Sequence, residues 1–448
     1  MKPNSFTRRD FLRRSALGGA GFLILANARS AYAYDANGKL DVAIIGAGGR
    51  GRDNLNGVAK AGENIVALCD VDENEGAKSF AQFPNAKRFK DFRRMFDAMG
   101  KGIDAVTVAT PDHTHAAAAA AAIRRGKHVY CEKPLTRTVH EARVLRQLAD
   151  KYKVVTQMGN QGSSSDGVRR SVELAWSGAI GEIREAHLWF PNGNEPHTRP
   201  TERPPVPANL DWDLWLGPAE FRPYHPSYAP RNWRGWRAFG SGIVGDFGCH
   251  TGNILFRALK LEQLWIPSVV GKRCIIRVEA LPSERNLEGY PRTMQVLVDL
   301  PARGELPPAR LTVNAGSRPS PDLMKGYPQG QWGDLVVGSK GAIYSDNPWN
   351  NNFVLLPEKD FEEVKHGPPQ TLPRGRDQVR EWTEACKGNG ATFSSFTIGG
   401  PLTELMQLIN LSTLFEEALD YDTISGRILN SSRANEALNR KYRKGWSL

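Results

Sequence analysis

The sequence predicts an α/β fold, with a doubly wound parallel sheet followed by an α+β domain that has a mostly antiparallel open sheet. In the first third of the chain, short apolar runs alternate with helix-compatible segments, as in parallel strands joined by crossover helices. Further on, strand patterns separated by Gly and Pro are typical of antiparallel sheet. The 448 residues suffice for two domains with full cores. We therefore expect domains at residues 39–160 and 161–448.

The first apolar run, residues 40–45, leads directly into a glycine-rich turn with the pattern G-x-G-x-x-G. These glycines permit a tight turn, close approach of a pyrophosphate and close helix–strand packing. A second apolar run ends at Asp70, whose carboxylate can accept hydrogen bonds from ribose hydroxyls and would repel a 2′-phosphate. This order of features predicts a Rossmann domain that binds NAD in preference to NADP. The alternative is a Gly-rich turn with an incidental Asp. The predicted cofactor contacts here are Gly46, Gly48, Gly49, Arg50, Gly51 and Asp70.

The rest of this domain continues the alternation. The predicted elements are strands at 105–109, 128–131 and 154–158 and helices at 115–125 and 138–151. Polar residues follow the strands at the edge where open α/β sheets bind ligands. After the third major strand come Thr110 and Pro111, and His115, which either contacts the cofactor or begins the helix. His113 and His115 beside Asp112 could form a metal pair, but no third ligand has suitable spacing. We expect no metal, and we expect His113 to be an exposed loop residue.

Glu132 and Lys133 follow the next strand. A lysine at this position can reach the space above a bound cofactor, where its ammonium could stabilise a developing alkoxide. Alone, such a lysine is more often a solvated surface charge. Gln161, near the domain junction, is a further candidate for an amide contact to cofactor or substrate.

The second domain begins with an irregular segment, because residues 191–230 contain ten prolines. Strand patterns follow it, and two helices are expected near the end of the chain. The predicted strands are 184–190, 269–278, 293–300, 311–313, 333–337, 342–344 and 353–356, and the predicted helices are 376–387 and 401–419.

One helix-like run in this domain places Asp246, His250 and Asn253 on one face, at i, i+4 and i+7. A histidine beside a carboxylate suits removal of a hydroxyl proton while a hydride leaves the same carbon. The alternative is a buried histidine that is tied to an aspartate for purely structural reasons.

Five of the eleven tryptophans lie within 48 residues, from Trp189 to Trp236. Indole rings pack against the C–H faces of sugars, and guanidinium and amide groups bind hydroxyls. Packing of the Pro-rich segment explains each ring equally well. The predicted substrate contacts are Trp233, Arg234 and Asn253.

Taken in order, the glycine turn, Asp70, Thr110-Pro111, Glu132-Lys133-Pro134 and Asp246-x-x-x-His250 resemble the Gfo/Idh/MocA family of glucose–fructose oxidoreductase and inositol dehydrogenase relatives. The resemblance implies NAD(P)-dependent redox chemistry at a secondary hydroxyl of a sugar, glycoside or polyol. It implies that Lys133 assists at the reacting oxygen and that His250 is the general base, oriented by Asp246. It also implies a dimer or tetramer. Asn253 departs from the Asp that many relatives have at this position.

Two other functions fit the same residues. Some members of the superfamily are glycosidases that use bound NAD for transient oxidation and elimination. A non-catalytic binding module is the other alternative, against which Lys133, Asp246 and His250 argue.

The N-terminus carries a predicted export signal over residues 1–33. Arg8-Arg9 belongs to a twin-arginine pattern, an apolar stretch follows, and Ala31-Tyr32-Ala33 offers a cleavage site. We therefore expect a periplasmic protein that uses the Tat translocase as a transient partner. The formal net charge is +11, but no dense Lys/Arg tract lies outside the signal, which argues against a nucleic-acid partner. No later segment has 18 consecutive apolar residues, so we expect no membrane anchor in the mature form.

Overall fold

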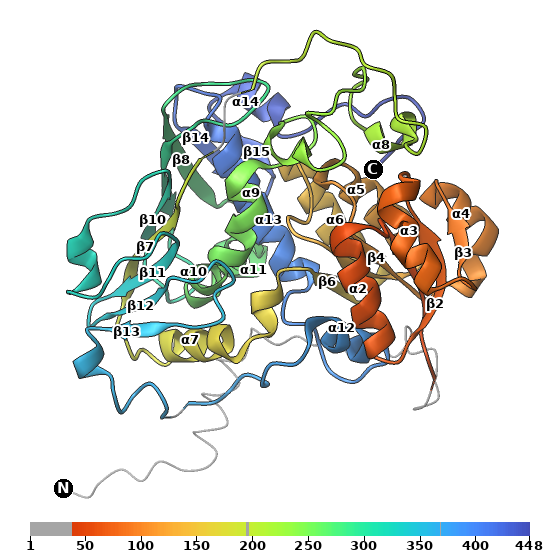
Figure 1. Ribbon diagram of the computed structural model, residues 1–448. Coiled ribbons are helices and arrows are strands. Elements are labelled where there is room, and N and C mark those ends of the chain that lie inside the picture. The colour runs from red at the N-terminus through yellow and green to blue at the C-terminus, as the bar shows by residue number, and fades with distance from the viewer. Residues whose placement is uncertain (1–37, 194–196, 368) are drawn as a thin grey trace, which may run out of the picture.

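The computed structural model describes residues 38–193, 197–367 and 369–448, and it contains two sheets that lie side by side (Figure 1). The predicted signal peptide lies outside the described residues. Within the described ranges, no helix has the length and apolar character needed to cross a bilayer.

The first sheet has six strands in the order β3-β2-β1-β4-β5-β6, and all neighbours are parallel. The strands are β1 (Asp41–Ile45), β2 (Asn64–Cys69), β3 (Lys87–Phe89), β4 (Ala105–Val108), β5 (His128–Cys131) and β6 (Thr156–Met158). The direction of winding reverses between β1 and β4, and ligands bind beyond the strand ends at such a switch point. The predicted doubly wound parallel sheet is confirmed.

Five helices connect these strands. They are α2 (Gly49–Lys60), α3 (Glu73–Gln82), α4 (Phe92–Met99), α5 (Asp112–Ile123) and α6 (Val139–Tyr152). Helix α6 begins with a capping box, because Thr138 and Glu141 each accept a hydrogen bond from the other's backbone amide. Helix α5 begins at Asp112, three residues before the predicted start, and an acidic residue is favourable in a first helical turn.

The second sheet has nine strands in the order β13-β12-β11-β7-β10-β9-β8-β14-β15. It is mostly antiparallel, as predicted, with one parallel pair between β7 and β10. The strands are β7 (Ile183–Phe190), β8 (Ile275–Pro282), β9 (Met294–Leu300), β10 (Ala309–Ala315), β11 (Gly333–Gly338), β12 (Ala342–Ser345), β13 (Val354–Leu356), β14 (Leu419–Asp422) and β15 (Arg427–Ile428).

The helices of this domain are α7 (Asp166–Trp176), α8 (Trp212–Leu216), α9 (Gly242–Thr251), α10 (Asn253–Ala258), α11 (Pro267–Val270), α12 (Gln378–Cys386), α13 (Phe396–Ser412) and α14 (Ser432–Ala437). The described 3₁₀ turns of this domain are η2 (Gln161–Ser164), η3 (Asn232–Gly235), η4 (Leu261–Trp265), η5 (Pro321–Met324) and η6 (Glu358–Asp360), and η1 (Gly100–Gly102) lies in the first domain.

Two predicted elements of this domain have wrong boundaries. The strand predicted at 269–278 begins later in the structure. Pro267 opens the short helix α11, and β8 begins only at Ile275. The predicted helix 401–419 begins at Phe396 and ends at Ser412. Its last predicted residue belongs to β14, which pairs with β8. Tertiary strand pairing thus decides the conformation of this segment.

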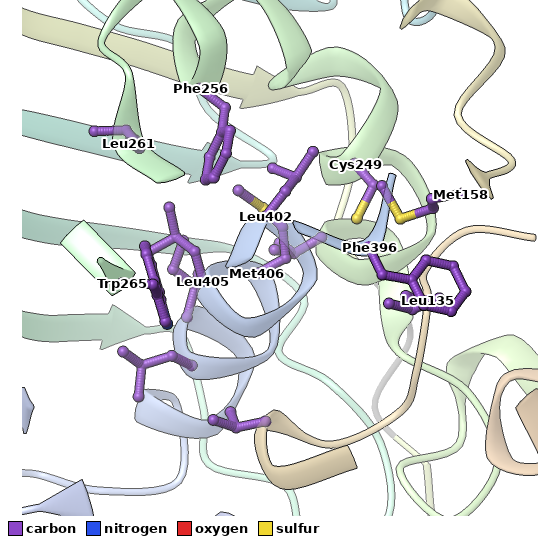
Figure 2. Close-up of a cluster of buried hydrophobic side chains, with 14 of the residues drawn as sticks. Leu135, Met158, Cys249, Phe256, Leu261, Trp265, Phe396, Leu402, Leu405 and Met406 are labelled. Atoms are coloured by element: carbon purple, nitrogen blue, oxygen red, sulfur yellow. The ribbon is translucent and has the colours of Figure 1, made fainter. Parts of the chain in front are cut away.

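Helix α13 lies between the two sheets and packs against α6 on one side and α9 on the other. In Figure 2, its residues Leu402, Leu405 and Met406 lie at the centre of a buried apolar cluster. Full burial of one such side chain stabilises the fold by about 1.5–3 kcal/mol. The two domains therefore share one core, and α13 fixes their relative position. The cluster also includes Leu135, Met158, Cys249, Phe256, Leu261, Trp265 and Phe396.

Helix α12 returns to the first domain, where it packs against α2 (Figure 1). Its Trp382 is fully buried in a cluster with residues of the first sheet, and the Tyr130 hydroxyl donates a 2.8 Å hydrogen bond to Gln378 Oε1. The boundary at residue 160 thus separates the strands of the two sheets, but α12, which follows this boundary in the sequence, packs against the first sheet and α2.

Candidate active site

A cleft of about 620 Å³ lies at the carboxyl ends of β1, β2, β4 and β5, with α9 and the segment around residues 214–234 as its opposite wall. Most of the predicted site residues line this cleft. They are Gly46, Gly48, Gly49, Arg50, Asp70, Thr110, Pro111, His115, Glu132, Lys133, Gln161, Trp233, Arg234, Asp246 and His250. Gly51 and Asn253 do not belong to its lining.

The glycine turn is shaped by close backbone contacts. Gly46 has φ +81°, and a Cβ there would lie 2.7 Å from the Ala109 carbonyl oxygen. A Cβ on Gly51 would lie 1.7 Å from the Gly46 carbonyl oxygen, so Gly51 supports the turn from behind. Helix α2 starts at Gly49, and the first amides of a helix lack acceptors within it. The turn therefore offers backbone donors and room for a phosphate.

Asp70 is held against this turn. Its Oδ2 accepts hydrogen bonds from the amides of Ala47 at 2.8 Å and Gly48 at 3.0 Å, and its Oδ1 accepts one from Asp72 at 3.0 Å. Burial raises the pKa of this carboxyl, and the three amides oppose that rise. Asp70 thus braces the turn while it faces the cleft. Its remaining lone pairs can accept ribose hydroxyls, so the cleft fits NAD.

Glu132 connects three polar side chains at the cleft. Its Oε1 accepts hydrogen bonds from Arg50 Nε and Asn54 Nδ2, each at 3.0 Å, and from Gln161 Nε2 at 3.5 Å. Gly159 leaves space for this carboxylate, because a Cβ there would lie 2.6 Å from its carboxyl carbon. Glu132 therefore fixes the positions of Arg50 and Gln161.

His115 is buried and joins two strand-end turns. Its Nδ1 lies 3.0 Å from the Pro134 carbonyl oxygen, and its Nε2 lies 2.7 Å from that of Thr110. Burial lowers its pKa. A neutral imidazole has one N–H, so it donates to one of these two carbonyls.

His113 is not the exposed loop residue that we expected. It lies inside α5, is fully buried, and its Nε2 is 2.8 Å from the Trp215 carbonyl oxygen. The rings of Trp215 and Phe239 pack around it, and burial lowers its pKa to about 3. The early start of α5 turns this side chain toward the segment that covers the cleft.

Lys133 and Asp246 meet across the two domains. Lys133 Nζ donates to Asp246 Oδ1 at 2.6 Å and to the Asp246 carbonyl oxygen at 2.7 Å. Arg234 Nε lies 3.5 Å from Asp246 Oδ2. Both members of the lysine–aspartate pair are mostly shielded, with side-chain exposures of 15% and 18%. Their interaction is therefore less screened than that of a surface pair.

His250 lies one turn further along α9 and is 3% exposed. Burial, followed by the positive charges of Lys133 and Arg50, lowers its pKa well below the usual value. Its buried Nδ1 has no hydrogen-bond partner within the described structure. The imidazole is therefore neutral and able to accept a proton in the cleft.

Asp112 is a cleft residue that we did not predict to act in the site. It is buried at the start of α5, and burial together with the charge of Asp246 raises its pKa to about 7. A hydrogen bond from Ser241 and the charges of Arg234 and Lys133 oppose the rise. Its position in the turn after β4, just beyond Thr110 and Pro111, was the signal that could have identified it.

Two of the five clustered tryptophans line the cleft, and all of the five except Trp189 belong to one apolar cluster of the Pro-rich segment. Trp215 and Trp233 line the cleft, and the Arg234 guanidinium lies 4.2 Å from the Trp233 ring centroid. Trp212 and Trp236 pack in the apolar cluster of the Pro-rich segment, while Trp189 stacks on Tyr344 in another cluster. Two further cleft tryptophans were missed, because they are isolated in the sequence: Trp349 and Trp446.

Asn253 lies outside the cleft. Helix α9 ends at Thr251 and α10 starts at Asn253, so the helical spacing expected from Asp246 is interrupted at Gly252. The Asn253 side chain is 1% exposed and donates to Ser163 Oγ at 2.9 Å. The structure does not bring it together with Lys133 and His250.

Two family models match the chain. One describes an oxidoreductase family with an NAD-binding Rossmann fold and matches residues 40–160, and the other describes the C-terminal alpha/beta domain of that family and matches residues 195–256.

Curated relatives match over part of their length. Inositol 2-dehydrogenase 1 from Saccharopolyspora erythraea is 31% identical over 185 residues, which are 39% of this chain and 53% of that protein. A glycosyl hydrolase family 109 protein from Solibacter usitatus is 32% identical over 150 residues, which are 30% of this chain and 34% of that protein. The chain thus spans about half or less of these relatives.

Among solved structures, the fold is similar to that of an inositol dehydrogenase homologue from Azotobacter vinelandii, complexed with NADH and myo-inositol. The match covers 86% of this chain and 97% of that chain. Its TM-score is 0.55 at 17% sequence identity, which supports the two-domain fold. Residues 40–160 therefore form an NAD-binding Rossmann domain. Models of one family thus match residues in both domains, and over those matched residues the chain belongs to the Gfo/Idh/MocA oxidoreductase family.

Proposed function

We propose that this protein is an exported, NAD-dependent oxidoreductase that acts on a secondary hydroxyl of a sugar, glycoside or polyol. The observation that carries the proposal is the 2.6 Å contact between Lys133 and Asp246, with His250 one turn away, in the cleft that contains the glycine turn. The relative named inositol 2-dehydrogenase and the fold neighbour solved with myo-inositol support this substrate class.

The roles of the residues follow from their charges. The glycine turn and Asp70 would hold NAD, which would supply the acceptor for a hydride from the carbinol carbon in oxidation and the hydride donor in reduction. The neutral His250 takes the hydroxyl proton in oxidation and gives it back in reduction. The Lys133 ammonium donates a hydrogen bond to the reacting oxygen and stabilises its developing negative charge. Asp246 orients Lys133.

The opposite wall of the cleft suits a carbohydrate. Trp215 and Trp233 provide flat apolar surfaces for the C–H faces of a sugar ring. Arg234, beside Asp246, provides donors for its hydroxyls.

Purification of the native protein followed by denaturation tests this function. We expect mass spectrometry to detect released NAD, and a panel of sugars and polyols to produce NADH absorbance that His250→Ala abolishes. A protein that neither releases nor binds NAD would overturn the proposal. Release of the aglycone from a nitrophenyl glycoside without net NADH would instead support the glycosidase alternative.

Export through the Tat translocase to the periplasm is part of the proposal and rests on Arg8-Arg9 and the residues that follow. We expect the double substitution Arg8→Lys and Arg9→Lys to retain the protein in the cytoplasm, as fractionation would show. A native protein that begins at Met1 in N-terminal sequencing would contradict export. We also propose a homo-oligomer, dimer or tetramer, which light scattering would test.

A further inference from the structure

The last residues of the chain return to the first domain, and the C-terminus lies beside α8 and α5 (Figure 1). Trp446, which is followed by two residues in the sequence, lines the cofactor cleft. The family models matched here end at residue 256, so they assign no role to this segment.

The segment is anchored before it reaches the cleft. Arg440 Nε and the Tyr442 hydroxyl both donate to Glu141 Oε1, at 3.0 and 2.7 Å, which ties the segment to α6. Arg443 donates to the carbonyl oxygens of Gly217 at 3.0 Å and Asp213 at 2.7 Å. These contacts bring the chain over the start of α5 and leave five residues beyond the last anchor.

Trp446 is in turn held by the start of α4. The Arg93 guanidinium lies 4.1 Å from the Trp446 ring centroid, and Arg93 Nη1 donates to the Gly445 carbonyl oxygen at 3.0 Å. The Phe92 ring, which also lines the cleft, is 5.9 Å from the Trp446 ring, centroid to centroid. Two aromatic rings are thus fixed together in this part of the cleft wall.

The sheet order identifies which end of the cofactor these rings would meet. Phe92 follows β3, on the β1–β2–β3 side of the switch point, where Asp70 also lies. Lys133 follows β5, on the other side. A dinucleotide spans the two halves of such a sheet, one mononucleotide on each. With the reacting groups at Lys133 and His250, the adenosine half lies toward Asp70 and Phe92.

From this geometry we propose that Trp446 forms the outer wall of the adenine subsite and binds the adenine of NAD together with Phe92. The inference rests on NAD binding by the Rossmann domain. Adenine is flat and uncharged, so an aromatic wall suits it, and base–aromatic stacking commonly strengthens binding about tenfold per ring. The end of the chain is then a part of the cofactor site, contributed by residues that are remote from the glycine turn.

The test is calorimetric titration of the full-length protein, freed of cofactor, with NAD and with ADP-ribose. Both ligands carry the adenosine, so we expect Trp446→Ala to weaken both by the same factor, roughly tenfold. Trp446→Phe should restore most of the loss. Phe221→Ala is the control, because Phe221 is an exposed aromatic residue that does not belong to the cleft lining. It should leave the affinity for ADP-ribose unchanged.

The outcomes are distinct. Wild-type affinity for ADP-ribose in Trp446→Ala overturns the adenine subsite and leaves the proposed oxidoreductase intact. Absence of binding of either ligand to the wild-type protein overturns both. If Trp446→Ala lowers the melting temperature, the titration is repeated with a chain that ends at Arg443, which keeps the anchors and lacks the Trp446 ring. The same loss of affinity in that chain supports the subsite, and wild-type affinity overturns it.

Discussion

Lys133 Nζ lies 2.6 Å from Asp246 Oδ1, so the end of β5 and the middle of α9 meet at one point between the two domains. Neither domain alone contains the candidate site. The buried helix α13 packs against α6 and α9, one from each domain, and so fixes the relative position of Lys133 and Asp246. The site is therefore a product of the interface between the domains.

We predict that Lys133→Met lowers kcat by about a hundredfold or more, because the donor that stabilises the developing alkoxide is lost. The affinity for NAD should stay near that of the wild type. Steady-state kinetics and calorimetry check both quantities. Lys272→Met, the same change at an exposed lysine, is the control and should alter neither. Equal kcat in the two variants would remove Lys133 from the mechanism.

We predict that His250→Ala lowers kcat by about a hundredfold to ten-thousandfold, through loss of the general base. The wild-type pH profile is a second test. Burial and two nearby cations lower the His250 pKa well below 6.5, so the imidazole remains an available base as the pH falls through 6.5. The acid limb of kcat/KM should therefore lie well below pH 6.5. An activity that halves near pH 6.5 would contradict this assignment.

Asp112 should make stability depend on pH. Its pKa rises from 3.8 to about 7 on folding, so the folded state holds the proton more tightly between these values. Stability then falls as the pH rises through this window, because ionisation of the buried carboxyl is unfavourable. We predict that Asp112→Asn raises the melting temperature at pH 8 by a few degrees. The difference from wild type should shrink at pH 4, and calorimetry at the two values decides the point.

Asp70 both braces the glycine turn and faces the cleft. We predict that Asp70→Asn weakens NAD binding by about tenfold or more, because a charged acceptor is lost. The ratio of NADP affinity to NAD affinity should rise, since the repulsion of a 2′-phosphate disappears. Titration with both dinucleotides measures this ratio. Asp53→Asn removes a nearby charge on the exposed side of α2 and should leave the ratio unchanged.

The sequence was sufficient for residues at the ends of parallel strands. Asp70 and Lys133 could be placed together because all the strands of the first sheet end at one edge, so neighbours along that edge are known once the strands are identified. His250 depended on helical spacing within one continuous helix, which α9 provides. Local rules therefore placed the proposed reacting groups in one cleft.

The residues that were misplaced depend on contacts between distant segments. Asn253 was assigned by helical spacing, but α9 ends at Thr251 and the spacing is interrupted at Gly252. His113 is buried because the segment with Trp215 packs on α5, which no local pattern reveals. Trp446 reaches the cleft through contacts with α4 and α6 that join residues hundreds of positions apart.

Helix α12 has a consequence for the order in which the chain can fold. Its Val379 and Trp382 cover Leu40, Val42 and other apolar residues of the first sheet, yet they leave the ribosome after most of the second sheet has been made. Until then, part of the nucleotide-binding half is exposed to water and open to chaperones. We expect a translation product that stops near residue 160 to be prone to aggregation, and only a polypeptide that includes α12 to be compact enough for transport in a folded state.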